Sequence, residues 1–151
     1  MDALQMLEQD HEKVKRILED LDSTTERAVK TREEGLAALK RELTVHELIE
    51  EEIFYPALKE HAEAKETVLE AYEEHDVVDA ILGELERTPV HEETWHAKFT
   101  VAKENLEHHI EEEEGEMFGQ ARELLEKEEL TSLGEQMQLR REQAKSERVG
   151  G

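Results

Sequence analysis

The fold of this chain is decided by residues 36–57, which read LAALKRELTVHELIEEEIFYPA. One set of residues in this stretch recurs at alternating steps of three and four: Leu36, Leu39, Leu43, His46, Glu50, Ile53 and Ala57. Residues at this spacing form one face of an α-helix, and the charged residues between them form its solvated face. Two members of the inner face, His46 and Glu50, are polar and interrupt an otherwise apolar stripe.

Three further stripes have the same spacing. They consist of Leu4, Leu7, His11, Val14, Leu18 and Leu21; of Val68, Ala71, His75, Val78, Leu82 and Leu85; and of Trp95, Phe99, Ala102, Leu106, His109, Glu113 and Met117. The stripes predict helices at about residues 2–29, 33–60, 64–87 and 91–128, with breaks near Thr31-Arg32, His61-Ala62 and Thr88-Pro89. Because short connections make neighbouring helices antiparallel, the expected architecture is an all-α, up-down-up-down four-helix bundle. Pro56 lies inside the second helix and should kink it or weaken its last turn.

The end of the chain predicts one more element. Ser132 begins a capping-box pattern, so a short helix should start at Thr131 or Ser132. The apolar residues that would dock this helix on the bundle are Leu130, Leu133 and Met137. We therefore expect a bundle domain over residues 1–128, followed by a short C-terminal helix and tail over residues 129–151 that fray after Lys145.

The composition excludes several classes of function. The chain has 41 Asp and Glu against 19 Lys and Arg, and its net charge of −22 argues against binding to the phosphate backbone of nucleic acids. Cysteine is absent, which excludes disulfides, thiolate metal ligands and a cysteine nucleophile. No apolar run approaches the roughly 20 residues that cross a bilayer, and the first residues lack the pattern of a signal peptide. We expect a cytoplasmic protein with neither a nucleic-acid nor a membrane partner.

The chain also contains an internal repeat. A shift of 64 residues places His11, Val14 and Leu18 on His75, Val78 and Leu82, and a shift of 63 residues places His46, Glu50 and Tyr55 on His109, Glu113 and Phe118. Each half is therefore a helical hairpin that carries one lone histidine and one His-x-x-x-Glu pair. The two hairpins should face each other across a pseudo-twofold axis.

Six polar residues occupy core positions of these helices: His11, His46, Glu50, His75, His109 and Glu113. All six fall near the middle of their helices, so the bundle should bring them to one level of the core. Burying bare imidazoles and carboxylates is costly unless they are paired or bind a metal. A single histidine of this kind is more often a hydrogen-bonded core residue, but a shared metal site explains all six together.

Four imidazoles and two carboxylates exceed the four ligands of a tetrahedral zinc ion. They suit two metal ions, each held by two histidines, with Glu50 and Glu113 as bridges. Imidazole and carboxylate together suit iron and, less selectively, manganese or zinc. The other acids of the runs Glu50 to Glu52 and Glu111 to Glu114 are expected on the solvated face. The other histidines are expected near helix ends, away from the cluster, except His108, which should lie at the surface or next to the ligands.

Two neighbouring residues are further candidates. Glu47 lies one turn before Glu50 and is a candidate for an extra carboxylate ligand, although its repeat counterpart is Ile110. Tyr72 lies three residues before His75 on the same face, either as a pocket residue that donates to a bound ligand or as a plain core residue.

The segments around these residues resemble the hemerythrin-like (HHE cation-binding) domain family. They are Asp10-His11-Glu12, His46 to Pro56, Glu74-His75-Asp76 and His109 to Glu114. The resemblance covers about residues 1–125. It implies a four-helix bundle with a non-haem, oxo- or hydroxo-bridged di-iron centre that meets dioxygen, peroxide or nitric oxide. The resemblance makes the same six residues the ligands of two iron ions.

The chain departs from the oxygen-carrying members of that family. Those members have His-x-x-x-His on the third helix and His-x-x-x-x-Asp on the fourth, whereas here Asp79 follows His75 and Glu113 follows His109, each by four residues. One imidazole is therefore missing, and its place is Asp79 or an open site. This departure favours peroxide or nitric oxide chemistry, or iron and redox sensing, over reversible oxygen carriage.

Several functions are compatible with these patterns. The leading hypothesis is a di-iron protein that binds or turns over a small oxidant, of peroxidase- or catalase-like type if it is an enzyme. The alternative is an iron, oxygen or redox sensor whose metal occupancy changes a surface that a protein partner reads. A metal-free acidic scaffold is the third. A ferritin-like enzyme is disfavoured, because it would need Glu-x-x-His on two helices and only Glu8 and His11 provide it on a core stripe.

Overall fold

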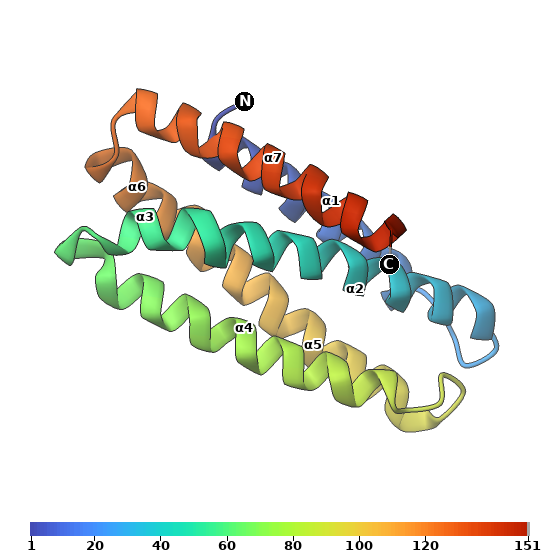
Figure 1. Ribbon diagram of the computed structural model, residues 1–151. Helices are drawn as coiled ribbons and strands as arrows, with labels where there is room; N and C mark the ends of the chain where they lie inside the picture. The colour runs from blue at the N-terminus through green and yellow to red at the C-terminus, as the bar shows by residue number, and fades with distance from the viewer. Residues whose placement is uncertain (151) are drawn as a thin grey trace.

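The computed structural model describes the backbone of residues 1–150 and the side chains of residues 1–147, and its regular elements within that range are helical (Figure 1). The α-helices are α1 (Ala3–Asp22), α2 (Val29–Ile49), α3 (Tyr55–Lys59), α4 (Lys65–Glu86), α5 (Glu93–Glu112), α6 (Phe118–Leu124) and α7 (Lys127–Gly150). A 3-10 turn, η2 (Ala62–Ala64), precedes α4, and two π-helical segments, η1 (Glu50–Phe54) and η3 (Glu113–Met117), join α2 to α3 and α5 to α6. None of the described helices is long and apolar enough to cross a membrane.

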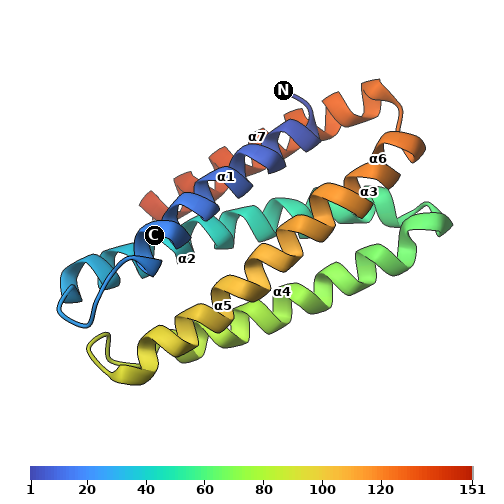
Figure 2. The same ribbon diagram turned by 180° about the vertical axis from the view of Figure 1, so that it is seen from behind.

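Two antiparallel helical hairpins form the bundle. The first pairs α1 with the continuous rod α2-η1-α3, and the second pairs α4 with the rod α5-η3-α6 (Figures 1 and 2). Helix α7 runs along α1 and α2 as a fifth helix, and both views show it beside α1. The predicted all-α, up-down-up-down bundle with a C-terminal helix is confirmed.

The first loop lies earlier in the chain than predicted. Helix α1 ends at Asp22, and the break expected near Thr31-Arg32 lies inside α2. The Thr24 hydroxyl donates to the Leu21 carbonyl at 2.6 Å, and the Ser23 hydroxyl donates in the same way to the carbonyl three residues before it. These hydroxyl groups satisfy the last helical carbonyls, so the helix ends at this point.

Arg32 closes the loop end of the bundle. Its side chain donates from Nε to Thr24 Oγ1 at 2.9 Å and from Nη1 to the Val90 carbonyl at 2.6 Å, and its guanidinium lies 4.3 Å from the centre of the Trp95 ring. Burial lowers the pKa of Arg32. One side chain therefore ties the loop of the first hairpin to the loop of the second.

Periodicity alone did not predict the two π-helical segments. The N–H of Tyr55 donates to the Glu50 carbonyl five residues before it, and the N–H of Phe118 donates to the Glu113 carbonyl in the same way. A π turn adds one residue to the helix, so the residue five positions after each glutamate turns toward the glutamate's side. The rod continues through Pro56 as far as Lys59, and η3 has no proline. The π turns therefore accompany the two glutamates, and Pro56 does not break the rod.

Helix α7 is longer than the short helix predicted from sequence. It starts at Lys127, before Thr131, and its backbone stays helical past Lys145 to Gly150, so the fraying expected there is absent up to that residue. A Glu129 carboxylate oxygen accepts the backbone N–H of Glu126 at 3.2 Å and caps the earlier start. The predicted docking residues Leu130, Leu133 and Met137 are all buried.

The apolar core consists of two clusters, one on each side of a polar layer. One cluster includes Leu7, Ile49, Ala71 and Met117, and the other includes Val14, Leu43, Val78 and Leu106. On α1, α2 and α4, and on the rod α5-η3-α6, the inward-facing histidine lies between residues of the two clusters. The apolar packing that holds the bundle together therefore also fixes the height of the histidines.

Gly134 provides a test of how closely α7 packs. A Cβ at Gly134 would lie 2.5 Å from the Met1 carbonyl oxygen and 2.8 Å from the Asp2 carbonyl carbon. These are backbone atoms, so Gly134→Ala must push α7 away from the start of α1. We expect a loss of about 1–3 kcal/mol in the free energy of unfolding, measured by urea denaturation.

Gly83→Ala is the matched control, because a Cβ at Gly83 would meet only Arg87 Nη1, at 3.6 Å. This substitution should stabilise α4 by about 0.5–1 kcal/mol. If the two variants change stability alike, α7 does not pack against the N-terminus as described.

Candidate metal centre

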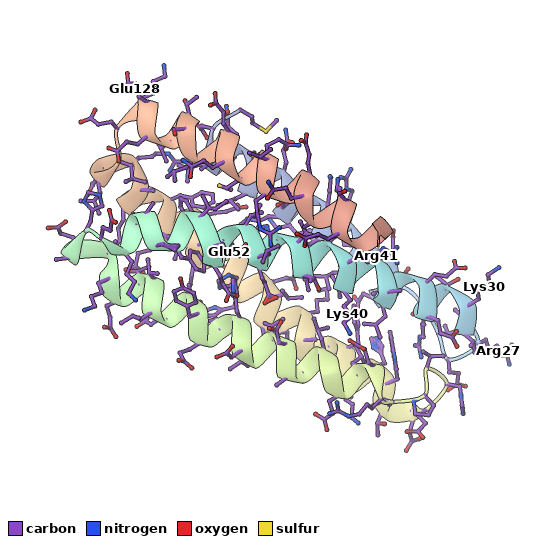
Figure 3. The ribbon with its side chains drawn as sticks, in the orientation of Figure 1. Arg27, Lys30, Lys40, Arg41, Glu52 and Glu128 are labelled. Atoms are coloured by element: carbon purple, nitrogen blue, oxygen red, sulfur yellow. The ribbon has the colours of Figure 1, made fainter. Side chains whose placement is uncertain are left out.

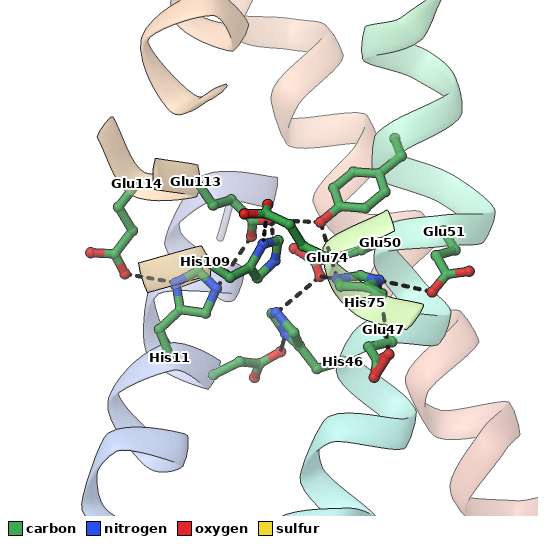
Figure 4. Close-up of polar contacts among 12 residues, drawn as sticks. His11, His46, Glu47, Glu50, Glu51, Glu74, His75, His109, Glu113 and Glu114 are labelled. Carbon is green, nitrogen blue, oxygen red and sulfur yellow. Dashed lines mark hydrogen bonds and ion pairs between the residues drawn. The ribbon is translucent and has the colours of Figure 1, made fainter. Parts of the chain in front are cut away.

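Four histidines enter the core at one level, each from a different long helix (Figure 4). His11 comes from α1, His46 from α2, His75 from α4 and His109 from α5, and all four are buried. The His11 and His46 rings lie 5.0 Å apart, as do the His75 and His109 rings. The histidines therefore form two pairs, and each pair belongs to one hairpin.

Glu50 and Glu113 lie between the two pairs. An oxygen of Glu50 is 3.2 Å from His46 Nε2 and 3.1 Å from His75 Nε2. The two oxygens of Glu113 lie 3.2 Å from His11 Nε2 and from His109 Nε2. Each carboxylate thus contacts one histidine of each hairpin, which is the arrangement that bridging between two metal ions requires.

Six inward-facing atoms of this cluster lack hydrogen-bond partners within the described part of the chain, whereas Nε2 of His75 and the other oxygen of Glu113 contact Tyr55. The six are the Nε2 atoms of His11, His46 and His109, both carboxylate oxygens of Glu50, and Oε1 of Glu113. An unpaired buried polar group costs about 1–3 kcal/mol, so a folded core does not normally leave six at one point. Cations at this point would satisfy all of them, and the residues present therefore fit a metal centre.

Four sets of residues in the described part of the chain have possible ligand atoms close enough to hold a metal ion, and two of these sets are fully buried and share Glu50. One buried set consists of His11, His46, Glu50 and Glu113, and the other of Glu50, His75 and His109. In each set the possible ligand atoms lie within 4.8 Å of one another. Glu50 belongs to both buried sets, as a bridging ligand would.

In each of these four histidines, the outward-facing nitrogen, Nδ1, contacts a carboxylate. The Nδ1 contacts are His11 with Glu114 at 2.7 Å, His46 with Asp10 at 2.9 Å, His75 with Glu51 at 2.8 Å and His109 with Glu74 at 2.9 Å. A carboxylate that accepts the Nδ1–H fixes the ring orientation and leaves the Nε2 lone pair free to bind a metal. The arrangement follows the internal repeat, because Asp10 corresponds to Glu74 and Glu51 to Glu114.

This outer ring of carboxylates was not predicted from sequence. Glu51 and Glu114 were expected on the solvated face, but each contacts a histidine of another helix. The usable signal was positional: an acidic residue stands directly before each lone histidine and directly after each of the two core glutamates.

Charge within the cluster shifts the pKa values of the histidines. Burial lowers the pKa of His109, but Glu113 and Glu74 outweigh this effect and raise it to about 10. Burial likewise opposes protonation of His75, and Glu50 outweighs it, which raises the pKa to about 9. In the metal-free protein, protons on these rings neutralise the buried glutamates, and a bound cation would take their place.

Tyr55 reaches the centre, and sequence reasoning missed it. Its hydroxyl donates to Glu113 at 2.6 Å and lies 3.2 Å from His75 Nε2. Burial and the charges of Glu113 and Glu50 raise the pKa of Tyr55 well above its usual value, so the hydroxyl keeps its proton. The π turn of η1 brings Tyr55 to this side of the helix, and a period of 3.6 residues hides that placement.

Tyr72, which was a candidate for either a pocket or a core residue, does not reach the centre. Its hydroxyl donates to the backbone carbonyl of Glu51 at 3.3 Å, and its ring packs edge-on against Tyr55 at 5.3 Å. Of the two roles weighed for Tyr72, the structure supports core packing, here behind Tyr55.

Glu47 and Asp79 lie outside the ring of inward-facing atoms. Glu47 is 3.9 Å from Nδ1 of His75, on the side of the ring that faces away from Nε2. Burial and a hydrogen bond with Asp79 raise the pKa of Glu47 to about 8. Asp79 is exposed and therefore does not fill the place of the missing imidazole.

A small cavity adjoins the four histidines. Its volume is about 20 Å³, and its remaining walls include Leu43, Glu47, Leu106 and Ile110. A single water needs roughly 10–15 Å³, so the space suits a ligand of water or diatomic size. The cavity gives the cluster an open side that faces apolar side chains.

Comparisons with known proteins agree with this description. Residues 2–121 match the family model described as the hemerythrin HHE cation-binding domain. The chain is also similar to the crystal structure of a hemerythrin HHE cation-binding domain-containing protein from Mycobacterium kansasii, a homolog of Rv2633c. That similarity has a TM-score of 0.87 and 29% sequence identity, and it covers 99% of this chain and 90% of that one. A comparison with curated proteins finds no match.

The Glu47–Asp79 contact predicts a pH effect in the metal-free protein. The Glu47 carboxyl ionises near its ordinary pKa of 4.5 when the chain is unfolded and near pH 8 when it is folded. Between these values the unfolded state releases the proton more readily, so this group lowers the stability of the wild type as pH rises. Glu47→Gln removes the ionisation and keeps a donor for Asp79.

Relative to wild type, the Glu47→Gln variant should therefore gain stability as pH rises from 5 to 8, as measured by denaturation of both proteins at each pH. A stability difference that is constant across this range would contradict a raised Glu47 pKa.

Proposed function

Because the chain belongs to the hemerythrin HHE cation-binding domain family, we propose that its buried centre holds two iron ions and binds or turns over a small oxidant, which is hydrogen peroxide, nitric oxide or dioxygen. The main support for this proposal is the arrangement of the four histidines in two pairs, with Glu50 and Glu113 each contacting one histidine of each pair. His11 and His46 would hold one ion, and His75 and His109 the other. Such an iron pair supplies Lewis acidity and electrons to a bound oxidant.

The chain's own residues prepare the site in three ways. The four outer carboxylates fix the rings so that each Nε2 points inward, which removes the cost of ordering the ligands when metal binds. The apolar walls keep bulk water away from the open side of the cluster. The cavity is small, and this favours peroxide and diatomic molecules over larger substrates.

Tyr55 supports turnover of an oxygen-containing ligand. Its hydroxyl lies within hydrogen-bond distance of both Glu113 and His75, which belong to the two helical arms of the second hairpin, η3 and α4. Because its pKa is raised, Tyr55 acts as a fixed hydrogen-bond donor rather than as an acid at neutral pH. The single hydroxyl hydrogen could donate to an oxygen-containing ligand in place of Glu113. The position of Tyr55 therefore favours an oxidoreductase of peroxidase- or catalase-like type over a protein that only binds the oxidant.

A second candidate function, an iron or redox sensor, is favoured by one contact of α7. Arg141 on α7 donates to Asp10 at 2.6 Å, and the same oxygen of Asp10 lies 2.9 Å from His46 Nδ1. A change in metal occupancy that moves His46 would thus alter one of the contacts of α7 with the bundle. A protein partner could then read the position of α7.

Iron content tests the leading proposal. Protein expressed in iron-rich medium should carry about two iron ions per chain by elemental analysis, which six protein ligands can hold between them. Glu50→Ala and Glu113→Ala should each lower this content, because each removes a contact to both histidine pairs. Glu111→Ala is the control, since Glu111 is an exposed member of the same acidic run. Fewer than two metals in the wild type, or unchanged iron in both variants, would refute the assignment.

A peroxide assay separates the two candidate functions. The enzyme proposal predicts that iron-loaded wild type turns over hydrogen peroxide and that Arg141→Met, which loses only the α7 contact, remains active. The sensor proposal predicts no turnover and a large rise in melting temperature on metal binding that Arg141→Met reduces. Arg140→Met is the control, because Arg140 pairs at 2.7 Å with Glu52, which is not one of the four carboxylates that contact a histidine Nδ1.

A further inference from the structure

We propose that small ligands reach the centre from one side of the bundle, through a groove between α2 and α4, and that the side chains of Leu43 and Glu47 form the gate. This inference rests on the proposed function, because it concerns the route of the ligand to the iron pair. It also assigns a role to Glu47, which lies beside the cluster without joining it.

The groove is an open space of about 630 Å³ between α2 and α4. Charged and polar residues form its rim, among them Lys40, which pairs with Glu86 of α4 at 2.7 Å. Figure 3 shows Lys40 on the side of α2 that faces α4. Asp79 also lines the groove, directly across from Glu47. A polar molecule therefore finds hydrogen-bonding groups along the groove up to its floor.

The groove and the histidine cavity share two wall residues, Leu43 and Glu47. Each of these side chains faces the groove on one side and the cavity on the other. The barrier between solvent and the four histidines is therefore one side chain thick at this point. Rotation of these two side chains would join the spaces without any separation of the helices.

The internal repeat distinguishes two walls of the cavity. The shift of 63 residues places Leu43 on Leu106 and Glu47 on Ile110, and Leu106 and Ile110 line the opposite wall of the same cavity. On that wall Ile110 is 3% exposed and belongs to an apolar core cluster. The side chain of Glu47 is 12% exposed and faces the groove. The second hairpin thus closes the cavity with two apolar residues, Leu106 and Ile110. The first hairpin closes it with Leu43 and with Glu47, which is polar and reaches solvent.

The composition of the gate predicts a preference among oxidants. The Glu47 and Asp79 carboxyl groups can hydrogen-bond a peroxide as it passes, and Leu43 leaves room only for a small molecule. Hydrogen peroxide and nitric oxide should pass, whereas an alkyl hydroperoxide should be excluded. The gate thus selects oxidants by their size, and this selection does not depend on the residues that would hold the metal.

The first test uses the metal-free protein and the absence of cysteine from the chain. Leu43→Cys and Leu106→Cys each introduce a single thiol, at positions related by the repeat. A methanethiosulfonate reagent should label the thiol of Leu43→Cys at least about tenfold faster than that of Leu106→Cys, because only the former adjoins the groove. Equal rates, or faster labelling of Leu106→Cys, would overturn the proposed route. This readout needs no iron and remains decisive if the proposed function fails.

The second test measures ligand entry in iron-loaded protein by stopped-flow absorbance. Leu43→Ala and Leu106→Ala remove the same atoms from the same cavity, but only the first opens the gate. With nitric oxide, Leu43→Ala should increase the association rate about fivefold or more, and Leu106→Ala clearly less. Leu43→Ala should also admit tert-butyl hydroperoxide, which wild type excludes.

Glu47→Ala is the second gate variant if Leu43→Ala folds poorly, since Glu47 is not part of the apolar core clusters. If wild type binds iron and nitric oxide but the gate and control variants show equal association rates, the gate is wrong and the proposed function stands. If wild type binds no iron, the proposed function is wrong and the labelling rates alone decide the route.

Discussion

The rest of this structure depends on one constraint, which is that six ionisable side chains meet at a single level of an apolar core. Six of their inward atoms are buried without hydrogen-bond partners in the described part of the chain, and the outer nitrogen of each histidine contacts a carboxylate. Such a layer is stable only if cations or protons neutralise its two glutamates. The apolar clusters on either side fix the height of the layer, and the outer ring fixes the direction of each histidine. Packing and metal chemistry therefore act on the same residues.

The two halves of the molecule repeat each other closely at the centre and differ around it. Asp10 and Glu74 hold equivalent histidines, but only Asp10 receives a cation from α7, through Arg141. The walls of the cavity differ as well, because Ile110 seals one side where Glu47 faces a groove on the other. The repeat thus supplies the symmetric set of side chains that the proposed pair of metal ions would need. The departures from it are the places where this chain sets access to the centre and its coupling to the fifth helix.

The helical stripes were sufficient to predict the bundle and the convergence of all six core residues, because a period of 3.6 residues and short loops leave few other arrangements. They placed the first loop too late, since the hydroxyls of Ser23 and Thr24 end α1 before the apolar pattern does. They also missed Tyr55, which reaches the centre only because a π turn shifts the helical period. The acidic runs appeared to be solvated faces, and only the packing of one hairpin on the other shows which acids hold a histidine. The helical periodicity could be predicted from the sequence, whereas the side-chain contacts between helices could not.

We propose that the layer holds two iron ions, one within each histidine pair. The decisive experiment is a crystal structure of the iron-loaded protein with an anomalous difference map measured at the iron absorption edge. We expect two peaks, one beside Nε2 of His11 and His46 and one beside Nε2 of His75 and His109, with Glu50 and Glu113 each contacting both. A single peak, or iron bound only at surface carboxylates, would contradict this proposal.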